Sequence, residues 1–407
     1  MRGRVLVLVA VLCVAALVLP LGAASAAAPA KATGPIVKVG VMLPIQATIA
    51  NPDAGDAFKA SISAFNNRKG IGKKHNRMQG IVCDTRGDAN GEVSCARQLA
   101  DAGVVATVGD LSFNNPAGVV DILQAAQIPR IGLIPTNVSE FSSTVSFPVS
   151  AGPIAAYIAI AVGLNKVHKT TMSLVRTDAA TGASFKGFIA PQFKQAGVDI
   201  VGDVAIASGS TDYTPYVRQA QENGANSVLM SVAEQSGTQF IAALAQLNTK
   251  LQLGGAPGTF SLETLRKFKN VTKGTLLADS FPYPSQNNVK NFPGLKQFFA
   301  DMKASGKKNL QPANIKPAAL QIWMSMLAFV KVTANLDSIT KETVLQALKT
   351  EKDLDLNGLI PPWTPSAPGF SLFKTSSNHT AYLMKFDGKN VITEKKPIDI
   401  STFFPSS

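Results

Sequence analysis

The stretch VVATVGDLSFNNPAGVVDILQAAQIPRIGLI (Val104 to Ile134) contains two short apolar runs separated by an amphipathic segment. The runs, residues 104–109 and 128–134, have the length and composition of buried strands. Between them, Asn115 followed by Pro116 predicts a helix that starts at Pro116, because Asn is a strong N-cap and Pro fits the first helical position. A strand, a helix and a second strand in this order predict a parallel β-α-β unit.

The same alternation extends along the chain in both directions. We expect earlier strands at residues 36–43 and 80–84, and helices at 53–68 and 92–103. After residue 153 a second series begins, with strands at 170–176, 199–206, 226–232, 251–255 and 274–281, and helices at 184–197 (with a kink or restart at Pro191), 215–224, 237–248, 294–306 and 317–336. Residues 381–392 predict a hairpin with an Asp387-Gly388 turn. Two similar series predict an α/β fold with two doubly wound lobes.

The N-terminus predicts export from the cytoplasm. Arg2 and Arg4 precede an apolar run of 15 residues, Val5 to Leu19, which is followed by the small-residue triplet Ala24-Ser25-Ala26. The run is shorter than the roughly 20 residues of a membrane-spanning helix, so we expect residues 1–26 to be a signal peptide cleaved near Ala26. Cys13 lies inside the run, so we expect no lipid anchor and a secreted, periplasmic or cell-envelope protein.

Loss of the signal peptide would leave Cys83 and Cys95 as a pair in an oxidising compartment, where we expect a disulfide. Zinc binding is the weaker alternative, because about four Cys or His ligands are needed and the three histidines are scattered. We therefore expect no metal site. The sequence Arg86-Gly87-Asp88 between the cysteines resembles an adhesion motif, but Gly and Asp are ordinary turn residues and we interpret the stretch as a turn.

The chain is basic, with 39 Lys and Arg against 26 Asp and Glu, and removal of Arg2 and Arg4 with the signal peptide would leave a net charge of +11. Such a charge suits acidic envelope polymers or nucleic acid. The positive residues are nevertheless dispersed and few aromatics lie among them. We interpret them as solvated surface and expect no nucleic-acid partner.

The order of several motifs resembles a known family. These motifs are VKVGVMLP, GVVATVGDLSFNNPAG, IPRIGLIPTN, TDYTPYVRQAQENGANSVLMS and AALAQLN, and together with the return segments they cover about Ile36 to Ile398. The chain resembles the type I extracytoplasmic solute-binding proteins of ABC transporters, in the branched-chain amino acid-binding family. The late segment GLIPPWTPSAPG resembles its actinobacterial members.

The resemblance implies a type I periplasmic-binding-protein fold, in which two Rossmann-like lobes are joined by three hinge crossings. We expect lobe 1 to contain residues 36–148 and 282–355, and lobe 2 to contain residues 149–281 and 356–407. The crossings are then expected near residues 146–152, 278–284 and 355–370. The resemblance also implies a monomer without a cofactor, which captures a small amino acid-like solute by hinge closure and delivers it to a membrane permease.

In open parallel sheets a ligand binds beyond the carboxyl ends of the strands. This rule selects the loop before Pro116, where Ser112 supplies a hydroxyl and the N–H groups around Asn114 are expected to bind a ligand carboxylate. Capping of the helix is an equally good interpretation of these residues. Phe113 is either a wall of the ligand site or a lid on the core of its own lobe, and we favour the wall.

The resemblance suggests further ligand contacts. Thr136 and Asn137 match a loop that contacts the amino acid backbone in the family, although they also fit a polar turn after Pro135. Glu234 lies in a loop where amino acid-binding members carry an acid for the ligand ammonium. Alternatively, Glu234 is a charge stabilised at a helix N-terminus.

One loop departs from the family pattern. After the first strand of lobe 2, family members usually carry an aromatic residue followed by Gly, whereas this chain has Ala180 and Thr181, with Asp178 retained nearby. The missing ring leaves room for a larger ligand. We expect Asp178 and Ala180 to face it.

The sequence offers little for an enzyme. It contains no Gly-x-Ser-x-Gly, His-Glu-x-x-His, Gly-x-x-x-x-Gly-Lys-Ser/Thr or Gly-x-Gly-x-x-Gly motif. A secreted enzyme is therefore a weaker alternative to a solute-binding protein. Binding or sensing of an amide or aromatic acid without transport is the nearer alternative.

Overall fold

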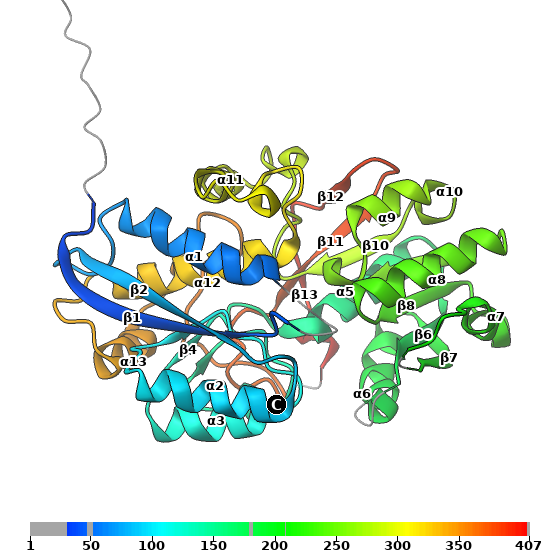
Figure 1. The fold of residues 1–407 in the computed structure, drawn as a ribbon. Coiled ribbons are helices and arrows are strands. Elements are labelled where there is room, and N and C mark those ends of the chain that lie inside the picture. Colours follow the sequence, from blue (N-terminus) through cyan, green and yellow to red (C-terminus); the bar gives the residue numbers. More distant parts are fainter. Residues whose placement is uncertain (1–30, 47–51, 179–181, 208, 405–407) are drawn as a thin grey trace, which may run out of the picture.

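The computed structural model describes residues 31–46, 52–178, 182–207 and 209–404. Two sheets lie at the centres of two lobes (Figure 1). Sheet 1 has five parallel strands in the order β2-β1-β3-β4-β5 (β1 Gly34–Leu43, β2 Asn76–Asp84, β3 Thr107–Val108, β4 Arg130–Ile131, β5 Ser146–Phe147). The predicted α/β fold with two lobes is confirmed.

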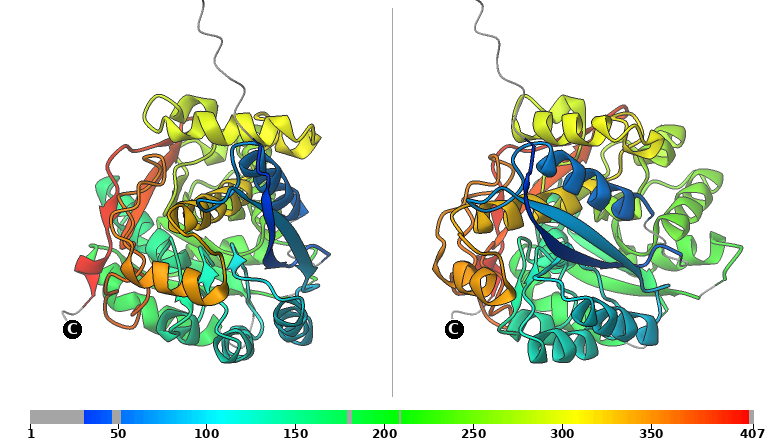
Figure 2. Two further views of the ribbon diagram at one scale, coloured as in Figure 1. Left: turned by 90° about the vertical axis from the view of Figure 1, so that its left-hand side faces the viewer. Right: turned by 60° about the vertical axis from the view of Figure 1, so that its left-hand side comes forward.

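Sheet 1 forms lobe 1 with helices on both faces. Helices α2 (Ala89–Asp101) and α3 (Pro116–Ala125) lie on one side, and α1 (Pro52–Asn66) and α12 (Pro317–Thr333) lie on the other (Figure 1). Helix α11 (Gly294–Ala304) packs on α1 at the outside of the lobe (Figure 2), and α13 (Lys341–Thr350) packs on α12. Strand β1 is buried on both faces, since Val39 and Val41 join one core cluster and Met42 joins another. This double burial explains its continuous apolar sequence.

Sheet 2 has eight strands in the order β12-β11-β10-β9-β8-β6-β7, with β13 beside β11. The strands of sheet 2 are β6 Thr171–Thr177, β7 Asp199–Ile206, β8 Ser227–Ser231, β9 Gln252–Gly255, β10 Leu276–Asp279, β11 Thr380–Phe386, β12 Val391–Thr393 and β13 Ile398–Asp399. The helices around it are α5 Gly152–Lys166, α6 Gly182–Gln195, α7 Thr214–Gln221, α8 Glu234–Gln246, α9 Leu262–Lys267 and α10 Lys269–Thr272. Sheet 2 and these helices form lobe 2. The Asp387-Gly388 turn joins β11 to β12 as predicted.

Several elements differ from the sequence-based expectation. Helix α5 was not predicted, because it is buried almost all round and therefore lacks an amphipathic period. The loop expected after β4 contains a short helix, α4 (Val138–Ser142), whose N-cap is Asn137. Pro191 lies inside α6, which continues past it without a restart.

The chain passes between the two sheets three times. It leaves β5 of sheet 1 for α5, which packs on β9, β10 and β11 of sheet 2. It returns between β10 and α11, and passes again between α13 and β11. The exact lobe bounds given above stay a prediction. Within the residues that the structure describes, no helix is long and apolar enough to cross a bilayer.

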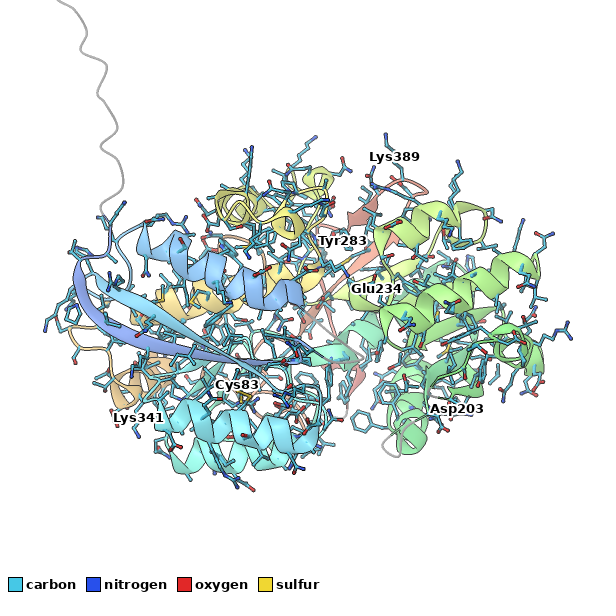
Figure 3. All side chains as sticks on the ribbon, viewed as in Figure 1. Cys83, Asp203, Glu234, Tyr283, Lys341 and Lys389 are labelled. Atoms are coloured by element: carbon cyan, nitrogen blue, oxygen red, sulfur yellow. A yellow bond between two sulfur atoms is a disulfide. The ribbon has the colours of Figure 1, made fainter. Side chains whose placement is uncertain are left out.

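Cys83 of β2 and Cys95 of α2 form a disulfide, as predicted (Figure 3). The bond ties strand to helix across a sequence separation of 12 residues. Arg86-Gly87-Asp88 lies in the connector, where the Asp88 carboxylate caps α2 by accepting from the Gly91 N–H. The turn interpretation of this stretch is supported by that cap.

We expect replacement of both cysteines by alanine to lower the free energy of unfolding by about 3 kcal/mol, because the open loop gains conformational entropy in the unfolded chain. Urea unfolding of both proteins measures the difference. Thiol titration of the mature parent under denaturing, non-reducing conditions should find no free thiol. Two titratable thiols per mature chain would contradict the bond.

Candidate functional site

A cavity of about 1140 Å³ opens between the two lobes. Lobe 1 contributes the start of α1, the loop before α3, and the segment leading into α12. Lobe 2 contributes the carboxyl ends of β6, β8 and β9 with the helix starts that follow β8 and β9. The cavity therefore lies beyond the carboxyl ends of these strands, where a ligand is expected to bind. Side chains that line it include Leu111, Tyr157, Thr177, Gln239, Phe260, Ser261, Glu263, Arg266 and Ile315.

Two of the residues selected from the sequence, Phe113 and Glu234, line the cavity. Phe113 is 47% exposed, which favours its interpretation as a wall of the cleft over a lid on the core of its own lobe. Glu234 begins α8, and Figure 3 shows it together with Tyr283 where the two lobes meet. The structure thus brings together one candidate from each lobe.

The N–H groups that we expected to bind a ligand carboxylate already have an acceptor. The buried carboxylate of Glu92 accepts from the backbone N–H groups of Phe113 (2.7 Å), Asn114 (3.1 Å) and Asn115 (2.6 Å). The Asn115 side chain caps α3 by accepting from the Gly118 N–H. Because these donors are satisfied within the protein, the contacts do not support their predicted use on a ligand.

Ser112 and Asn114 are not among the residues that line the cavity. Ser112 is fully buried, and its carbonyl accepts a hydrogen bond from Thr136 Oγ1 at 2.8 Å. The Asn114 side chain donates to the Gly87 carbonyl at 2.9 Å. In this structure both residues fix the loop that presents Phe113.

Thr136 and Asn137 also make local contacts. The Thr136 N–H donates to the Glu140 carboxylate at 2.8 Å, and the Asn137 side chain accepts from the Ser139 N–H at 3.0 Å. Neither residue lines the cavity. Asp178 is exposed and also lies outside the cavity lining, whereas Ala180 falls outside the described residues.

A buried arginine of lobe 1 forms ion pairs with acidic residues next to the loops of Phe113 and Thr136. Arg130 is fully buried, with Nε 3.4 Å from an Asp110 oxygen and Nη1 3.0 Å from a Glu140 oxygen. Asp110 also accepts from the Met42 N–H and from Thr107 Oγ1. Burial raises the pKa of Asp110 and of Glu140, and the positive charge of Arg130 opposes both shifts. Arg130 thereby compensates two acids that would otherwise be buried without a cation.

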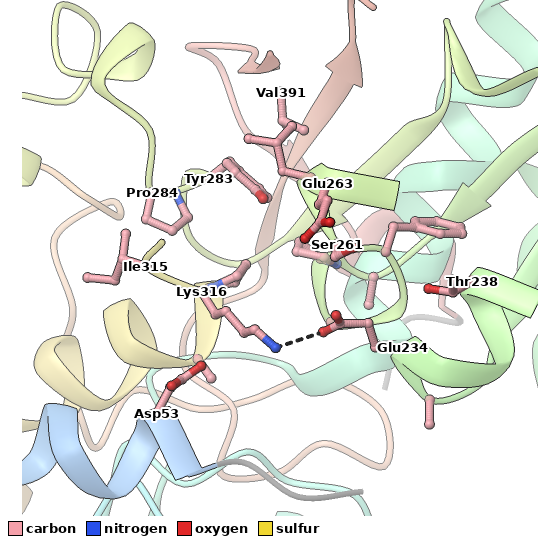
Figure 4. Close-up of a pocket in the computed structure, with 18 of the residues that line it drawn as sticks. Asp53, Glu234, Thr238, Ser261, Glu263, Tyr283, Pro284, Ile315, Lys316 and Val391 are labelled. Atoms are coloured by element: carbon pink, nitrogen blue, oxygen red, sulfur yellow. Dashed lines mark hydrogen bonds and ion pairs between the residues drawn. The ribbon is translucent and has the colours of Figure 1, made fainter. Parts of the chain in front are cut away.

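An ion pair crosses the cavity between the lobes. Lys316, at the N-cap of α12, places Nζ 3.2 Å from a Glu234 carboxylate oxygen (Figure 4). Tyr283 lies nearby, and its burial raises the pKa of the phenol to about 12, so the hydroxyl is neutral at physiological pH. On the side of lobe 2, Tyr157 donates to Ser231 Oγ at 2.9 Å. Sequence reasoning missed Lys316, because nothing in its local sequence points to a partner 82 residues away.

Among the described residues, no group of three or more His, Cys, Asp or Glu side chains could hold a metal ion. The charged side chains of the cavity are instead Asp53, Glu234, Glu263, Arg266 and Lys316. Asp53 is buried and accepts from Asn309 Nδ2 at 2.7 Å. This set can bind the charged groups of a small organic molecule by hydrogen bonds and ion pairs.

Comparison with solved structures shows the same fold in several binding proteins. A fatty acid ABC transporter substrate-binding protein from Thermomonospora curvata has 16% identity and a TM-score of 0.74, with 93% of this chain and 97% of that chain covered. A branched-chain amino acid ABC transporter protein from Thermus thermophilus with bound valine has 16% identity and a TM-score of 0.73, with 91% and 98% covered. A leucine-binding protein from Thermotoga maritima has 15% identity and a TM-score of 0.69, with 89% and 99% covered.

No curated protein matches the sequence. A family model described as periplasmic binding protein matches residues 36–390, which is most of the chain. The match begins at the first strand predicted from the sequence and runs through both lobes. The chain belongs to the periplasmic binding protein family.

Proposed function

We propose that this protein is the extracytoplasmic substrate-binding component of an ABC importer, and that it captures a small amino acid-like organic solute between its lobes. The observation that supports this proposal most directly is the cavity of about 1140 Å³, to which both lobes contribute side chains. A ligand bound there contacts both lobes at once, so its binding energy favours closure about the three crossings. The protein would act as a monomer, without a cofactor, and deliver the solute to a membrane permease.

The side chains around the cavity suit a ligand with an apolar part and a charged part. Leu111, Phe113, Phe260 and Ile315 offer apolar surface. Glu234 and Lys316 offer one charge of each sign. We propose Phe113 and Glu234 as ligand contacts, and we assign Ser112, Asn114, Thr136 and Asn137 to the support of the loops. Asp178 and Ala180 stay predicted contacts.

A specific observation favours a second candidate, a ligand that lacks the α-amino acid group, such as an amide or an aromatic acid. Glu92 satisfies the backbone donors at the start of α3, so these donors are not free for the carboxylate of an amino acid. The proteins of similar fold include a fatty acid ABC transporter substrate-binding protein and a branched-chain amino acid transporter protein with bound valine, so similarity of fold supports an amino acid ligand no more than a ligand of another class.

The test is native mass spectrometry of protein purified without denaturation, followed by a thermal-shift screen of amino acids, amides, aromatic acids and fatty acids. A bound small molecule of one class, with a rise in melting temperature on its addition, is the expected result. Turnover of a bound compound would instead favour a secreted enzyme. Failure of every compound to bind would contradict the proposed function.

We expect the ligand that raises the melting temperature also to reduce the radius of gyration, because hinge closure brings the lobes together. Small-angle X-ray scattering with and without saturating ligand measures the change. A variant that unfolds normally but no longer binds this ligand should keep the larger radius. An unchanged radius in the saturated parent would contradict closure.

A further inference from the structure

The ion pair between Glu234 and Lys316 joins the two lobes across the cavity. Glu234 comes from the first turn of α8 in lobe 2, and Lys316 from the N-cap of α12 in lobe 1. Their side chains are 38% and 50% exposed, so the pair is accessible to a molecule that enters the cavity. Figure 4 shows both side chains pointing toward one another, with the carboxyl group of Asp53 on the other side of Lys316.

The position of Lys316 is not explained by the stability of its helix. A cation at a helix N-terminus faces the positive end of the helix dipole, which disfavours it. The Lys316 side chain makes no capping hydrogen bond to α12, and Pro317 occupies the first turn. The favourable contact of the ammonium group is the one with Glu234, in the other lobe.

We infer that Lys316 sets the charge specificity of the cavity by exchange: its ammonium group neutralises Glu234 while the cleft is empty, and a ligand replaces it there. This inference rests on the proposed function. In the exchange, a ligand cation takes the place of Lys316 on Glu234, and the released Lys316 binds a ligand anion. A ligand that carries both charges close together therefore inserts between the two side chains and leaves every charge paired.

Ligands with a single charge lack this balance. A carboxylate alone binds Lys316 but leaves Glu234 without a cation when closure removes water from the cleft. An amine alone binds Glu234 but displaces Lys316 without pairing it. Because an unpaired charge in a desolvated site is heavily penalised, the pair discriminates against both. Removal of the Glu234 charge should therefore shift the preference to ligands with a carboxylate alone. Removal of the Lys316 charge should shift it to ligands with an amine alone.

The experiment uses three probes of nearly the same shape: leucine, 4-methylpentanoate, which lacks the amino group, and 3-methylbutylamine, which lacks the carboxylate. Calorimetry measures their binding to the mature parent, to Glu234→Gln and to Lys316→Met. In the parent, leucine should bind tightest. Glu234→Gln should lose leucine affinity by about 30-fold or more, the lower end of the effect of breaking a buried charge pair, and should prefer 4-methylpentanoate. Lys316→Met should instead prefer 3-methylbutylamine.

The pair of Lys166 and Glu394 provides a matched control. It is also an exposed Lys–Glu pair, with Nζ 3.4 Å from the carboxylate and side chains 53% and 51% exposed, but neither residue lines the cavity. Lys166→Met and Glu394→Gln should leave the order of the three probes unchanged. Circular dichroism of all variants checks that they are folded.

Different binding results would contradict the exchange of Lys316 alone or the proposed solute binding as well. Binding with the same order of preference in the parent, Glu234→Gln and Lys316→Met would overturn the exchange while leaving solute binding intact. Preference of the parent for 4-methylpentanoate would also overturn it, and would favour the second candidate ligand class. Absence of binding by all three probes to all proteins, when the wider thermal-shift screen also finds no ligand, would overturn the proposed function and the inference together.

Discussion

Replacement of Arg130 by methionine is expected to lower the free energy of unfolding by about 3–5 kcal/mol, the cost of removing one partner from a buried ion pair. Arg130, Asp110 and Glu140 are all buried, so the variant would leave two carboxylates without their cation. Methionine fills much of the volume of the arginine stem, which limits the contribution of a cavity. Urea unfolding of the parent and Arg130→Met at pH 8 measures the loss.

The pH dependence of this loss identifies its cause. Without Arg130, burial raises the folded-state pKa of Asp110 and Glu140 further above the unfolded values. A carboxyl group with a raised folded-state pKa destabilises the protein as the pH rises, because the folded protein must then ionise it in an unfavourable place. The loss should therefore be larger at pH 8 than at pH 5.

A triple variant, Arg130→Met with Asp110→Asn and Glu140→Gln, is the matched control. It removes the two acids along with the cation, so no uncompensated charge stays buried. It should recover much of the stability that Arg130→Met loses, as charge-free replacements of buried ion pairs do. Equal instability of the single and triple variants would show that packing around Arg130, and not charge, accounts for the loss.

The sequence predicted those parts of the fold that local patterns encode. Asn115 and Pro116 define the start of α3 through the chemistry of the N-cap and the first helical position, and the structure has that helix start. The Asp387-Gly388 turn is likewise a local property of two residues. Helix α5 was not predicted, because its burial almost all round removes the polar face from which an amphipathic helix is recognised.

The site was predictable only as a set of loops. The carboxyl-end rule selected the loop of Phe113 and the family resemblance selected the loop of Glu234, but the hydrogen-bond and ion-pair partners of these loops are distant residues. Glu92, which accepts from the N–H groups at the start of α3, lies 21 residues before Phe113 on another helix. Lys316 comes from the other lobe. Such pairings depend on the tertiary arrangement, which propensity and periodicity do not specify.

Asp279→Asn is expected to raise the free energy of unfolding at pH 8 by on the order of 3 kcal/mol, after a discount for partial solvent access. Asp279 ends β10, where the chain leaves sheet 2 for lobe 1. By exposed area the residue is only partly buried, but protein atoms surround the carboxyl group, and this burial raises its pKa from 3.8 to about 7. Its Oδ1 accepts from the Ser280 N–H at 2.7 Å, a hydrogen bond that the amide oxygen of asparagine can keep.

The raised pKa of Asp279 determines the direction in which the stability of the parent changes with pH. Between about pH 4 and pH 7 the folded protein holds a proton on Asp279 that the unfolded chain has lost, so the parent loses stability as the pH rises through this window. Asp279→Asn lacks this dependence, and its advantage should fade as the pH falls from 8 toward 4. Tyr382 pairs with Asp279 across β10 and β11, and its pKa of about 12 keeps it neutral throughout.

Asp387→Asn is a control of opposite sign. The N–H groups of Asn390 and Lys389 hold the pKa of the exposed Asp387 carboxyl below its usual value, so its charge stabilises the hairpin at neutral pH and ceases to do so in acid. Asp387→Asn should therefore be less stable than the parent at pH 8, and the two should converge as the pH falls through the lowered pKa. Urea unfolding at pH 8, 6 and 4 measures Asp279→Asn, and unfolding at pH 8, 4 and 3, which extends below the usual Asp pKa of 3.8, measures Asp387→Asn. A stability gain of Asp279→Asn that is the same at all three pH values would contradict the raised pKa, because it would show that the Asp279 carboxyl group has the same pKa in the folded and unfolded protein.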